Sequence, residues 1–327
     1  MQQYRDTDYA AVSAALHARE AKLLTQAMAE RMIDAAAPEE SYKTLLECGY
    51  APLERCTLEN VEHALSQARR ELYREVSVLA PDKRIIELFQ IKYDYHNAKL
   101  ALKSKRTGED VSRLAMDCGR FDAQKVLRGE TSAVSAAMSR AMAQAESEAG
   151  HSGDVRMAEL LLDRACYEEM SALANETGST FLKDYVALQI DAINLRTLVR
   201  TQRMGCEDEI LAAAMLPGGR MFPTQLKDAH GDHLTALTHG TPLSAAGELA
   251  AKLLDGGGSL TEFERACDDA LMTFLQRARR TPFGPEVVVG YLGAKEAEFT
   301  AVRTILSGKI AGLNAEDIRA RLRMSYL

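Results

Sequence analysis

The sequence predicts an all-α protein built from three similar helical units, and composition and spacing both support this prediction. Aromatic residues make up only 6% of the 327 residues and tryptophan is absent, whereas strands favour aromatic and β-branched side chains. Only 8 prolines occur, so long helices can run without interruption. Apolar residues recur at spacings of three and four, and no segment alternates as a half-buried strand would.

This periodicity places helices along almost the whole chain. We predict them at residues 8–36, 39–48, 58–79, 82–106, 109–117, 131–148, 154–175, 179–204, 207–215, 243–254, 261–279, 285–311 and 315–323. Gly108 is a natural C-terminal stop, and Asn314 can cap the last helix. Thr261 and Glu264 have the spacing of a capping box. Residues 217–242, rich in Gly, Pro and His, are expected to be irregular with one or two short helices.

An internal repeat is the most informative feature of the sequence. A shift of 97 residues places Asp94 on Asp191 and Asn97 on Asn194, and it also matches Gly108 with Gly205. The apolar residues between these positions coincide as well, so both segments present the same helix face.

A third, more distant copy follows, in which Glu298 corresponds to Asp191 and Arg303 to Arg196. The chain is therefore divided into units 1–118, 119–218 and 219–327. Such units are too long for the common helical repeats, so we expect a body with pseudo-threefold symmetry rather than a thin solenoid.

The Asp–Asn pairs allow two interpretations. Residues three apart share a helix face, so each pair could be buried and could hydrogen-bond neighbouring helices to fix their packing. Alternatively, the aspartate could act as a general base or a metal ligand. Because an active site is usually unique and a packing device recurs, we predict structural helix-packing roles. The residues are Asp94, Asn97, Asp191, Asn194, Glu298 and Arg303.

Composition limits the other function classes. A net charge of −7 lacks the basic footprint of a nucleic-acid-binding protein and argues against direct docking on anionic lipid. No apolar run is long enough to cross a bilayer, and the N-terminus lacks a signal-peptide pattern. The six cysteines form no C-x-x-C pair and are expected to be reduced thiols.

Two further motifs carry weak chemical signals. His230, His233 and His239 could supply metal ligands, but no H-E-x-x-H motif or nearby cysteine completes a familiar site. Gly256–Gly258 precedes a helix but lacks the lysine of a P-loop. We predict no catalytic residue, cofactor or metal, while a metal-dependent enzyme using the histidines and a generic helical scaffold remain the alternatives.

Three segments in order then indicate a family. They are "LFQIKYDYHNAKLALKSK" at 88–105, "DYVALQIDAINLRTLVR" at 184–200, and residues 282–322, which begin "PFGPEVVVGYLGAKEAEF". Together they resemble the C subunit of V-type (archaeal-type) ATP synthases, which is related to the d subunit of the eukaryotic vacuolar ATPase.

The resemblance implies a funnel of three helical units and a non-catalytic rotor subunit of the central stalk. It implies partners at both ends, with central-stalk subunits D and F on one side and the membrane proteolipid (c/K) ring on the other. The protein would then couple ATP chemistry to proton or sodium transport. It would lie peripherally at the cytoplasmic face of the plasma membrane and contact the membrane only through partner subunits.

Overall fold

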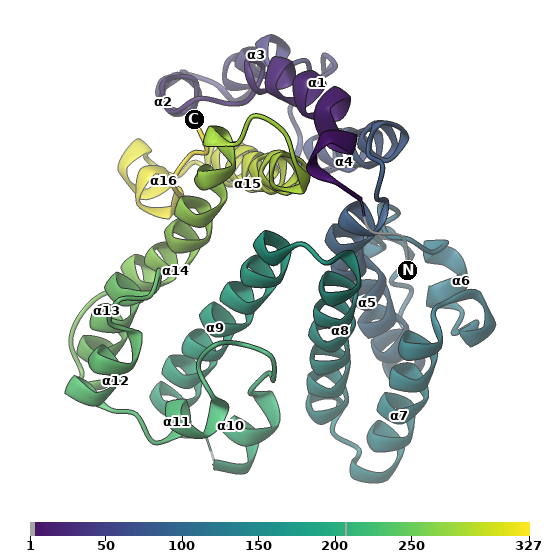
Figure 1. The fold of residues 1–327 in the computed structure, drawn as a ribbon, viewed down its shortest axis with the longest axis vertical. Coiled ribbons are helices and arrows are strands. Elements are labelled where there is room, and N and C mark those ends of the chain that lie inside the picture. Colours follow the sequence, from purple (N-terminus) through teal and green to yellow (C-terminus); the bar gives the residue numbers. More distant parts are fainter. Residues whose placement is uncertain (1–3, 207) are drawn as a thin grey trace. The chain divides into compact units, whose positions relative to one another are not determined.

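The structure is a computed structural model that describes residues 4–206 and 208–327, and all regular elements in these residues are helices. The predicted all-α class is therefore confirmed. The chain forms two compact units (Figure 1). Unit 1 spans Asp82–His230, and unit 2 combines the N-terminal segment up to Pro81 with Gly231–Leu327. The division into three repeats stays a prediction beside these two units.

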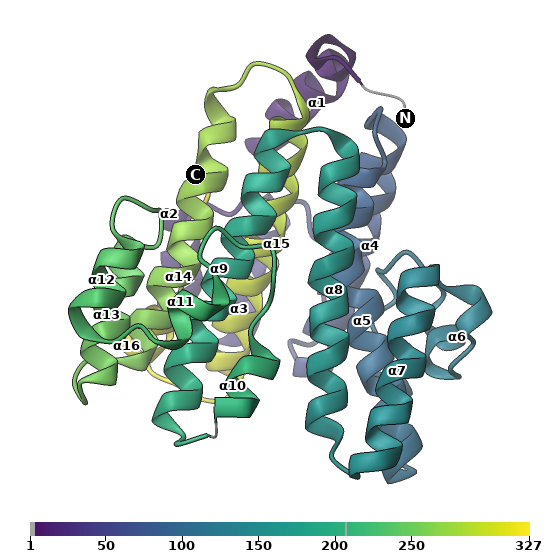
Figure 2. The ribbon, with the colours of Figure 1, turned by 60° about the horizontal axis from the view of Figure 1, so that its bottom comes forward.

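The described part of unit 1 contains four long helices, α5, α7, α8 and α9, and several short ones. Its α-helices are α5 Arg84–Thr107, α6 Ala123–Leu127, α7 Ala136–Ser152, α8 Val155–Thr177, α9 Thr180–Arg203, α10 Asp208–Ala214 and α11 Pro223–Lys227. Two 3₁₀ turns, η2 Ser112–Leu114 and η3 Thr131–Ala133, lie between α5 and α7. Helix α8 packs against α5, α7 and α9, and Figure 2 shows α5, α7 and α8 side by side.

Unit 2 is built from both halves of the sequence. From the N-terminal segment come η1 Asp6–Tyr9, α1 Ala10–Glu20, α2 Gln26–Asp34, α3 Pro38–Glu47 and α4 Leu58–Leu79. From the C-terminal segment come α12 Gly231–Thr238, α13 Ser244–Leu254, α14 Leu260–Leu275, η4 Gln276–Arg280, α15 Pro285–Ile310 and α16 Ala315–Arg321.

Helix α15 is the central element of unit 2. Residues 287–294, "VVVGYLGA", are all buried, as expected of a helix that is apolar on every side. It packs against α1, α2, α3 and α4 from the N-terminal segment and against α14 and α16 from the C-terminal one. The core of unit 2 therefore requires both chain segments.

Most helix ends agree with the predictions. Gly108 ends α5 with φ of 73°, and the Asn314 Oδ1 atom accepts a hydrogen bond from the Asp317 N–H at 2.8 Å. The region 217–242 contains two short helices, α11 and α12, as expected. Residue 207, the predicted start of one helix, lies outside the described residues.

Three helix predictions are wrong. Residues 109–117 form no α-helix and contain only the 3₁₀ turn η2. Residues 8–36 form two helices, because the chain leaves the helix after Glu20 and Thr25 caps α2 by accepting from the Met28 N–H at 3.2 Å. Helix α14 begins earlier than predicted, because Ser259 rather than Thr261 is its N-cap and accepts from the Glu262 N–H at 3.3 Å.

None of the helices in residues 4–206 and 208–327 is long and apolar enough to cross a membrane.

Close packing of α15 gives a first prediction. A Cβ atom at Gly290 would lie 2.6 Å from the Cβ of Ala278, which cannot rotate away. Overpacking costs roughly 1–3 kcal/mol, and the better helix propensity of alanine returns up to about 1 kcal/mol. We therefore expect Gly290→Ala to lower the free energy of unfolding by about 1–2 kcal/mol in urea titrations.

Gly257→Ala is the matched control, since its Cβ would approach only the Lys252 carbonyl oxygen, at 3.6 Å. Its free energy of unfolding should stay within about 0.5 kcal/mol of the wild-type value. Equal stability of both variants would contradict the packing argument.

Candidate functional site

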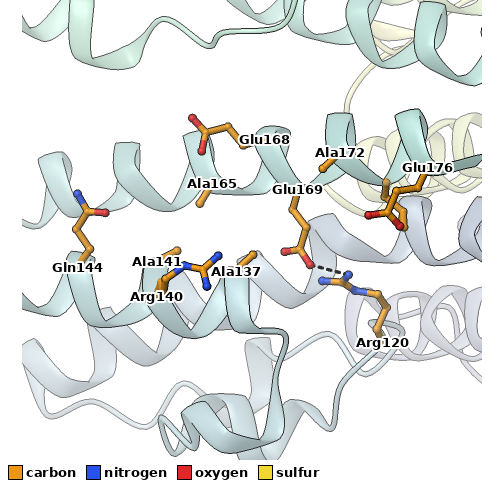
Figure 3. Close-up of a pocket in the computed structure, with 11 residues that line it drawn as sticks. Arg120, Ala137, Arg140, Ala141, Gln144, Ala165, Glu168, Glu169, Ala172 and Glu176 are labelled. Carbon is orange, nitrogen blue, oxygen red and sulfur yellow. Dashed lines mark hydrogen bonds and ion pairs between the residues drawn. The ribbon is translucent and has the colours of Figure 1, made fainter.

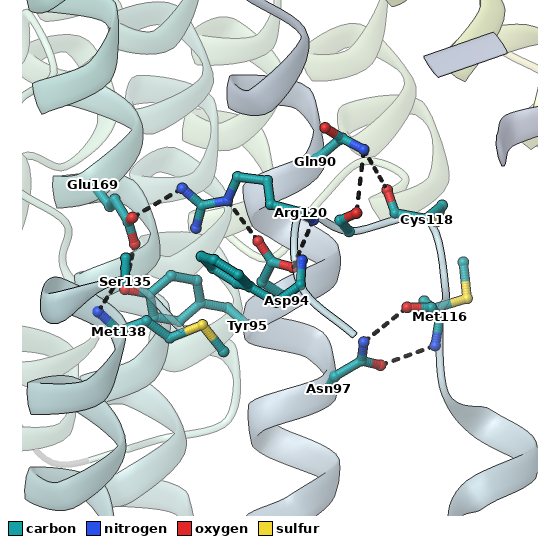
Figure 4. Close-up of polar contacts among 12 residues, drawn as sticks. Gln90, Asp94, Tyr95, Asn97, Met116, Cys118, Arg120, Ser135, Met138 and Glu169 are labelled. Carbon is teal, nitrogen blue, oxygen red and sulfur yellow. Dashed lines mark hydrogen bonds and ion pairs between the residues drawn. The ribbon is translucent and has the colours of Figure 1, made fainter. Parts of the chain in front are cut away.

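Two buried Asp–Asn pairs each bind a loop that follows their own helix. In the first, Asp94 and Asn97 on α5 hold the backbone of Met116–Phe121, and we call this arrangement the first clamp (Figure 4). In the second, Asp191 and Asn194 on α9 hold Leu216–Met221 and form the second clamp. Both clamps lie in unit 1.

The asparagine of the first clamp pairs with a single residue of the loop. Asn97 Nδ2 donates to the Met116 carbonyl oxygen at 2.7 Å, and the Met116 N–H donates to Asn97 Oδ1 at 2.9 Å. The side chain is fully buried, so these bonds satisfy polar atoms that water does not reach. The two hydrogen bonds therefore fix the position of the loop at Met116.

The aspartate of the first clamp binds the far end of the same loop. Asp94 Oδ1 accepts from the backbone N–H groups of Arg120 at 2.9 Å and Phe121 at 3.3 Å. Asp94 Oδ2 accepts from Arg120 Nε at 2.6 Å. The carboxylate is 0% exposed, and an unpartnered charge there would be very unfavourable.

Arg120 extends the first clamp to a second helix. Its Nη1 atom donates to Glu169 Oε1 on α8 at 2.9 Å, and the Tyr95 hydroxyl donates to Glu169 Oε2 at 2.9 Å. Burial raises the pKa of Asp94, and the hydrogen bonds from Arg120 and Phe121 act against that rise. Burial alone would lower the pKa of Arg120, but its bonds to Glu169 and Asp94 raise it, so the guanidinium stays charged.

The second clamp repeats this geometry with less charge. Asn194 Nδ2 donates to the Leu216 carbonyl oxygen at 2.8 Å, and the Leu216 N–H donates to Asn194 Oδ1 at 2.7 Å. Asp191 accepts the N–H groups of Arg220 and Met221, both at 3.0 Å.

The Arg220 guanidinium binds elsewhere, donating from Nη2 to Asp184 at 2.6 Å. Burial raises the pKa of Asp191, and the hydrogen bonds from the two backbone N–H groups are the main effect that acts against this rise.

A glycine makes each clamp possible. A Cβ atom on Gly119 would overlap Asp94 Oδ1, and a Cβ atom on Gly219 would overlap Asp191 Oδ1. Both clamped loops therefore contain Gly–Arg, at 119–120 and 219–220. Only glycine lets the backbone approach the carboxylate this closely.

The third copy uses a different partner segment. Glu298 on α15 accepts from the Leu24 N–H at 2.8 Å and from the Tyr50 hydroxyl at 2.7 Å, and it pairs with Lys295. Burial and then Glu298 raise the pKa of Tyr50 well above its ordinary value, so the phenol keeps its proton and donates. In the two clamps the backbone donor comes from the loop that follows the helix. For Glu298 it comes from the N-terminal segment instead.

Arg303 marks a second recurring contact. It pairs with Glu62 on α4, while its counterpart Lys99 pairs with Asp163 on α8, at 2.7 Å from Nζ to Oδ1. In each case a basic residue five positions beyond the buried carboxylate reaches an acidic residue of a neighbouring helix. These pairs are partly exposed, so each contributes modestly to stability.

The sequence analysis identified the buried side chains that accept hydrogen bonds, but it did not identify the groups that donate to them. The clamps hold loops rather than neighbouring helices, and the Gly–Arg pairs were missed. A comparison at a fixed shift of 97 residues cannot find them, because the second loop lies three residues further from its helix than the first. Allowing that insertion would have aligned "CGRF" with "GGRM".

A cavity of about 500 Å³ lies beside the first clamp, between α7 and α8 (Figure 3). Its lining combines alanines with charged residues, including Arg120, Arg140, Glu169 and Glu176. Among the described residues that line it there is no histidine, cysteine or serine.

The histidine region shows no metal centre within the part of the chain that the structure describes. No group of three or more His, Cys, Asp or Glu side chains there could hold a metal ion. His233 lies on α12, His230 precedes this helix and His239 follows it.

Comparison with known proteins decides the family. The family model described as ATP synthase (C/AC39) subunit matches residues 12–321. This chain belongs to that family. The C subunit of the V-type sodium ATPase of Enterococcus hirae is 22% identical, over 98% of this chain and 99% of the relative.

Other relatives agree with the family assignment. The C subunit of the A-type ATP synthase of Methanocaldococcus jannaschii is 24% identical, over 96% of this chain and 86% of its own length. The C subunit of the V-type ATP synthase of Thermus thermophilus is 26% identical, over 93% and 94% respectively. The family assignment agrees with the prediction that this chain is a structural subunit of such an ATPase complex.

The clamp glycines give a second prediction. Gly119→Ala and Gly219→Ala should each lower the free energy of unfolding by about 2–3 kcal/mol, because the new methyl group displaces a buried carboxylate from its donors. Gly150→Ala is the control, since the nearest atom to its Cβ is Arg106 Nη2 at 3.9 Å. Urea unfolding that does not separate the clamp variants from this control would disprove the steric role.

Titration of Asp191 gives a third prediction. The pKa of its carboxyl is raised from the ordinary 3.8, so its contribution to stability is full below pH 3.8 and is lost as pH rises through the folded-state value. Asp191→Asn removes this titration. The stability of the wild type relative to this variant should therefore increase as pH falls from 7 toward 4.

Urea unfolding at several pH values measures this difference. Asn194→Ala disrupts the same clamp without removing a titrating group, so its stability relative to the wild type should not vary with pH. A pH-independent difference for Asp191→Asn would contradict the assigned direction.

Proposed function

We propose that this protein is a rotor subunit of the central stalk in a V-type or A-type ATP synthase. It couples a shaft of subunits D and F to the membrane proteolipid ring, and so links ATP chemistry to proton or sodium movement. The observation that carries this proposal is the family match over residues 12–321, together with relatives named as the C subunit that align over nearly their whole length.

The internal construction of each unit suits a coupling role. A part that transmits torque must resist shear between its elements. In unit 1 the clamps tie two loops to the long helices α5 and α9, and Arg120 ties one of these loops to α8. In unit 2 the buried Glu298 joins α15 to the N-terminal segment. These bonds are buried, so water and salt compete with them poorly.

The pseudo-threefold funnel belongs to the same proposal. A buried acidic residue recurs at Asp94, Asp191 and Glu298, and in each case it accepts backbone N–H groups. This recurrence supports three related repeats with boundaries near 118 and 218. The funnel would bind the shaft at one end and the ring at the other.

The proposed location is peripheral, at the cytoplasmic face of the plasma membrane, with membrane contact through partner subunits. Stable protein interfaces bury more than roughly 1,000 Å², so both ends would form large contacts. Polar contacts at their rims would weaken as salt screens them.

Affinity purification from membranes gives a fourth prediction. The tagged full-length chain should recover the proteolipid ring and subunits D and F at low ionic strength, and raised ionic strength should reduce the recovered ring. The Gly150→Ala variant serves as a folded control. Absence of ring and shaft subunits under gentle, low-salt conditions would overturn the proposed function.

A further inference from the structure

The connection between α14 and α15, residues 276–284, carries three arginines and no acidic residue. Arg277, Arg279 and Arg280 in η4 are all exposed, and no acidic residue occurs between Asp269 and Glu286. Within the described residues, none of the three forms an ion pair, whereas Arg319 and Arg323, also in unit 2, each pair with a carboxylate. The chain carries an excess of seven negative charges, so acidic residues are not scarce.

Local contacts hold two of these arginines in position. The Arg277 guanidinium lies 5.0 Å from the centroid of the Phe274 ring. Arg279 Nη1 donates to the Tyr326 carbonyl oxygen at 3.3 Å. Arg277 and Arg280 are three residues apart, so they lie on the same face of the 3₁₀ helix. Two of the three charges are therefore held by contacts within unit 2, and all three lie on a helical turn.

Exposed apolar side chains lie at the same end of unit 2. Helices α4 and α15 are antiparallel, as shown by Glu296 contacting Arg69 and Tyr73 while Arg303 contacts Glu62. The start of α15 is thus level with the end of α4, and the connection from α14 arrives at this end (Figure 2).

Three apolar residues are exposed at this end. Phe283 is 40% exposed, Val78 81% and Leu79 40%. These apolar side chains therefore remain exposed to water in the folded unit 2. Together with the three arginines they form what we call the arginine end: Val78, Leu79, Arg277, Arg279, Arg280 and Phe283.

We propose that the arginine end is a docking surface for a protein partner that presents carboxylates around an apolar side chain. The choice of basic residue favours a protein over a lipid surface. No lysine occurs between Lys252 and Lys295, and arginine binds carboxylates through two parallel hydrogen bonds. Protein interfaces are enriched in arginine and aromatic residues and depleted in lysine.

The number of basic residues also favours a protein partner over a lipid surface. Recognition of anionic lipid usually requires a cluster of about four to eight basic residues, and lysine serves it as well as arginine. The arginine end has three arginines and an aromatic ring, which matches the composition of protein hot spots. The inference rests on the proposed function in one respect, namely that the partner is another rotor subunit.

The double variant Arg277→Gln, Arg280→Gln tests this inference in the full-length protein. Both side chains are exposed and form no ion pair within the described residues, so the fold should be retained. Binding is measured to three probes. These are membranes that carry the proteolipid ring but are stripped of peripheral subunits, purified subunits D and F, and protein-free vesicles of equal parts phosphatidylglycerol and phosphatidylcholine.

We expect the double variant to bind the ring membranes or the D–F shaft about tenfold more weakly than the wild type. Its binding should also depend less on salt, because two interfacial charges are gone. Phe283→Ser should weaken binding to the same partner. The control Arg55→Gln, Arg113→Gln removes two exposed arginines that also lack ion pairs among the described residues, and it should bind like the wild type.

Each remaining outcome counts against the inference. Wild-type affinity of the double variant for both protein partners would overturn the inference while leaving the proposed function intact. Loss of vesicle binding with unchanged protein binding would assign the surface to lipid instead. Failure of the wild type to bind either partner would contradict the proposed function and, with it, the partner assigned here.

Discussion

A carboxylate buried in the middle of a long helix requires donors that its own helix does not provide, because the helical N–H groups are already bonded to carbonyl oxygens. Asp94 and Asp191 meet this requirement with the N–H groups of a loop that returns to the helix. The loop must come close enough to need glycine, and an asparagine one turn further along fixes its other end. The path of the chain after α5 and α9 therefore follows from satisfying one buried charge in each helix.

Glu298 meets the same requirement by a different route. The residue three positions later is Ala301, so no asparagine assists it. Its backbone donor is Leu24, which lies 274 residues away in the sequence. Helix α15 thus uses the N-terminal segment where α5 and α9 use the residues that follow them. This explains why unit 2 combines both ends of the sequence whereas unit 1 is continuous.

The helical class and the buried acceptors could be predicted because both depend on local spacing. Asp94 and Asn97 share a face with the apolar residues of their helix, and the repeat identifies Asp191, Asn194 and Glu298. The backbone donors carry no side-chain signal of their own, and only an alignment that allows the three-residue insertion would point to the Gly–Arg loops that supply them. Residues 8–36 have helix-forming side chains throughout, yet the break at 21–25 exposes the Leu24 N–H that Glu298 accepts. A tertiary bond there overrides local propensity.

The composite construction of unit 2 has a consequence for synthesis on the ribosome. Helices α1–α4 leave the ribosome first, but α15, against which they pack, begins only after residues 80–284, about 205 residues, have been added. At about 5–20 residues per second this interval lasts roughly 10–40 seconds. During that time α1–α4 can pack against one another but lack their native contacts with α15. The nascent N-terminal segment is therefore a natural client for chaperones that bind exposed apolar helices, whereas unit 1 can fold as soon as it emerges.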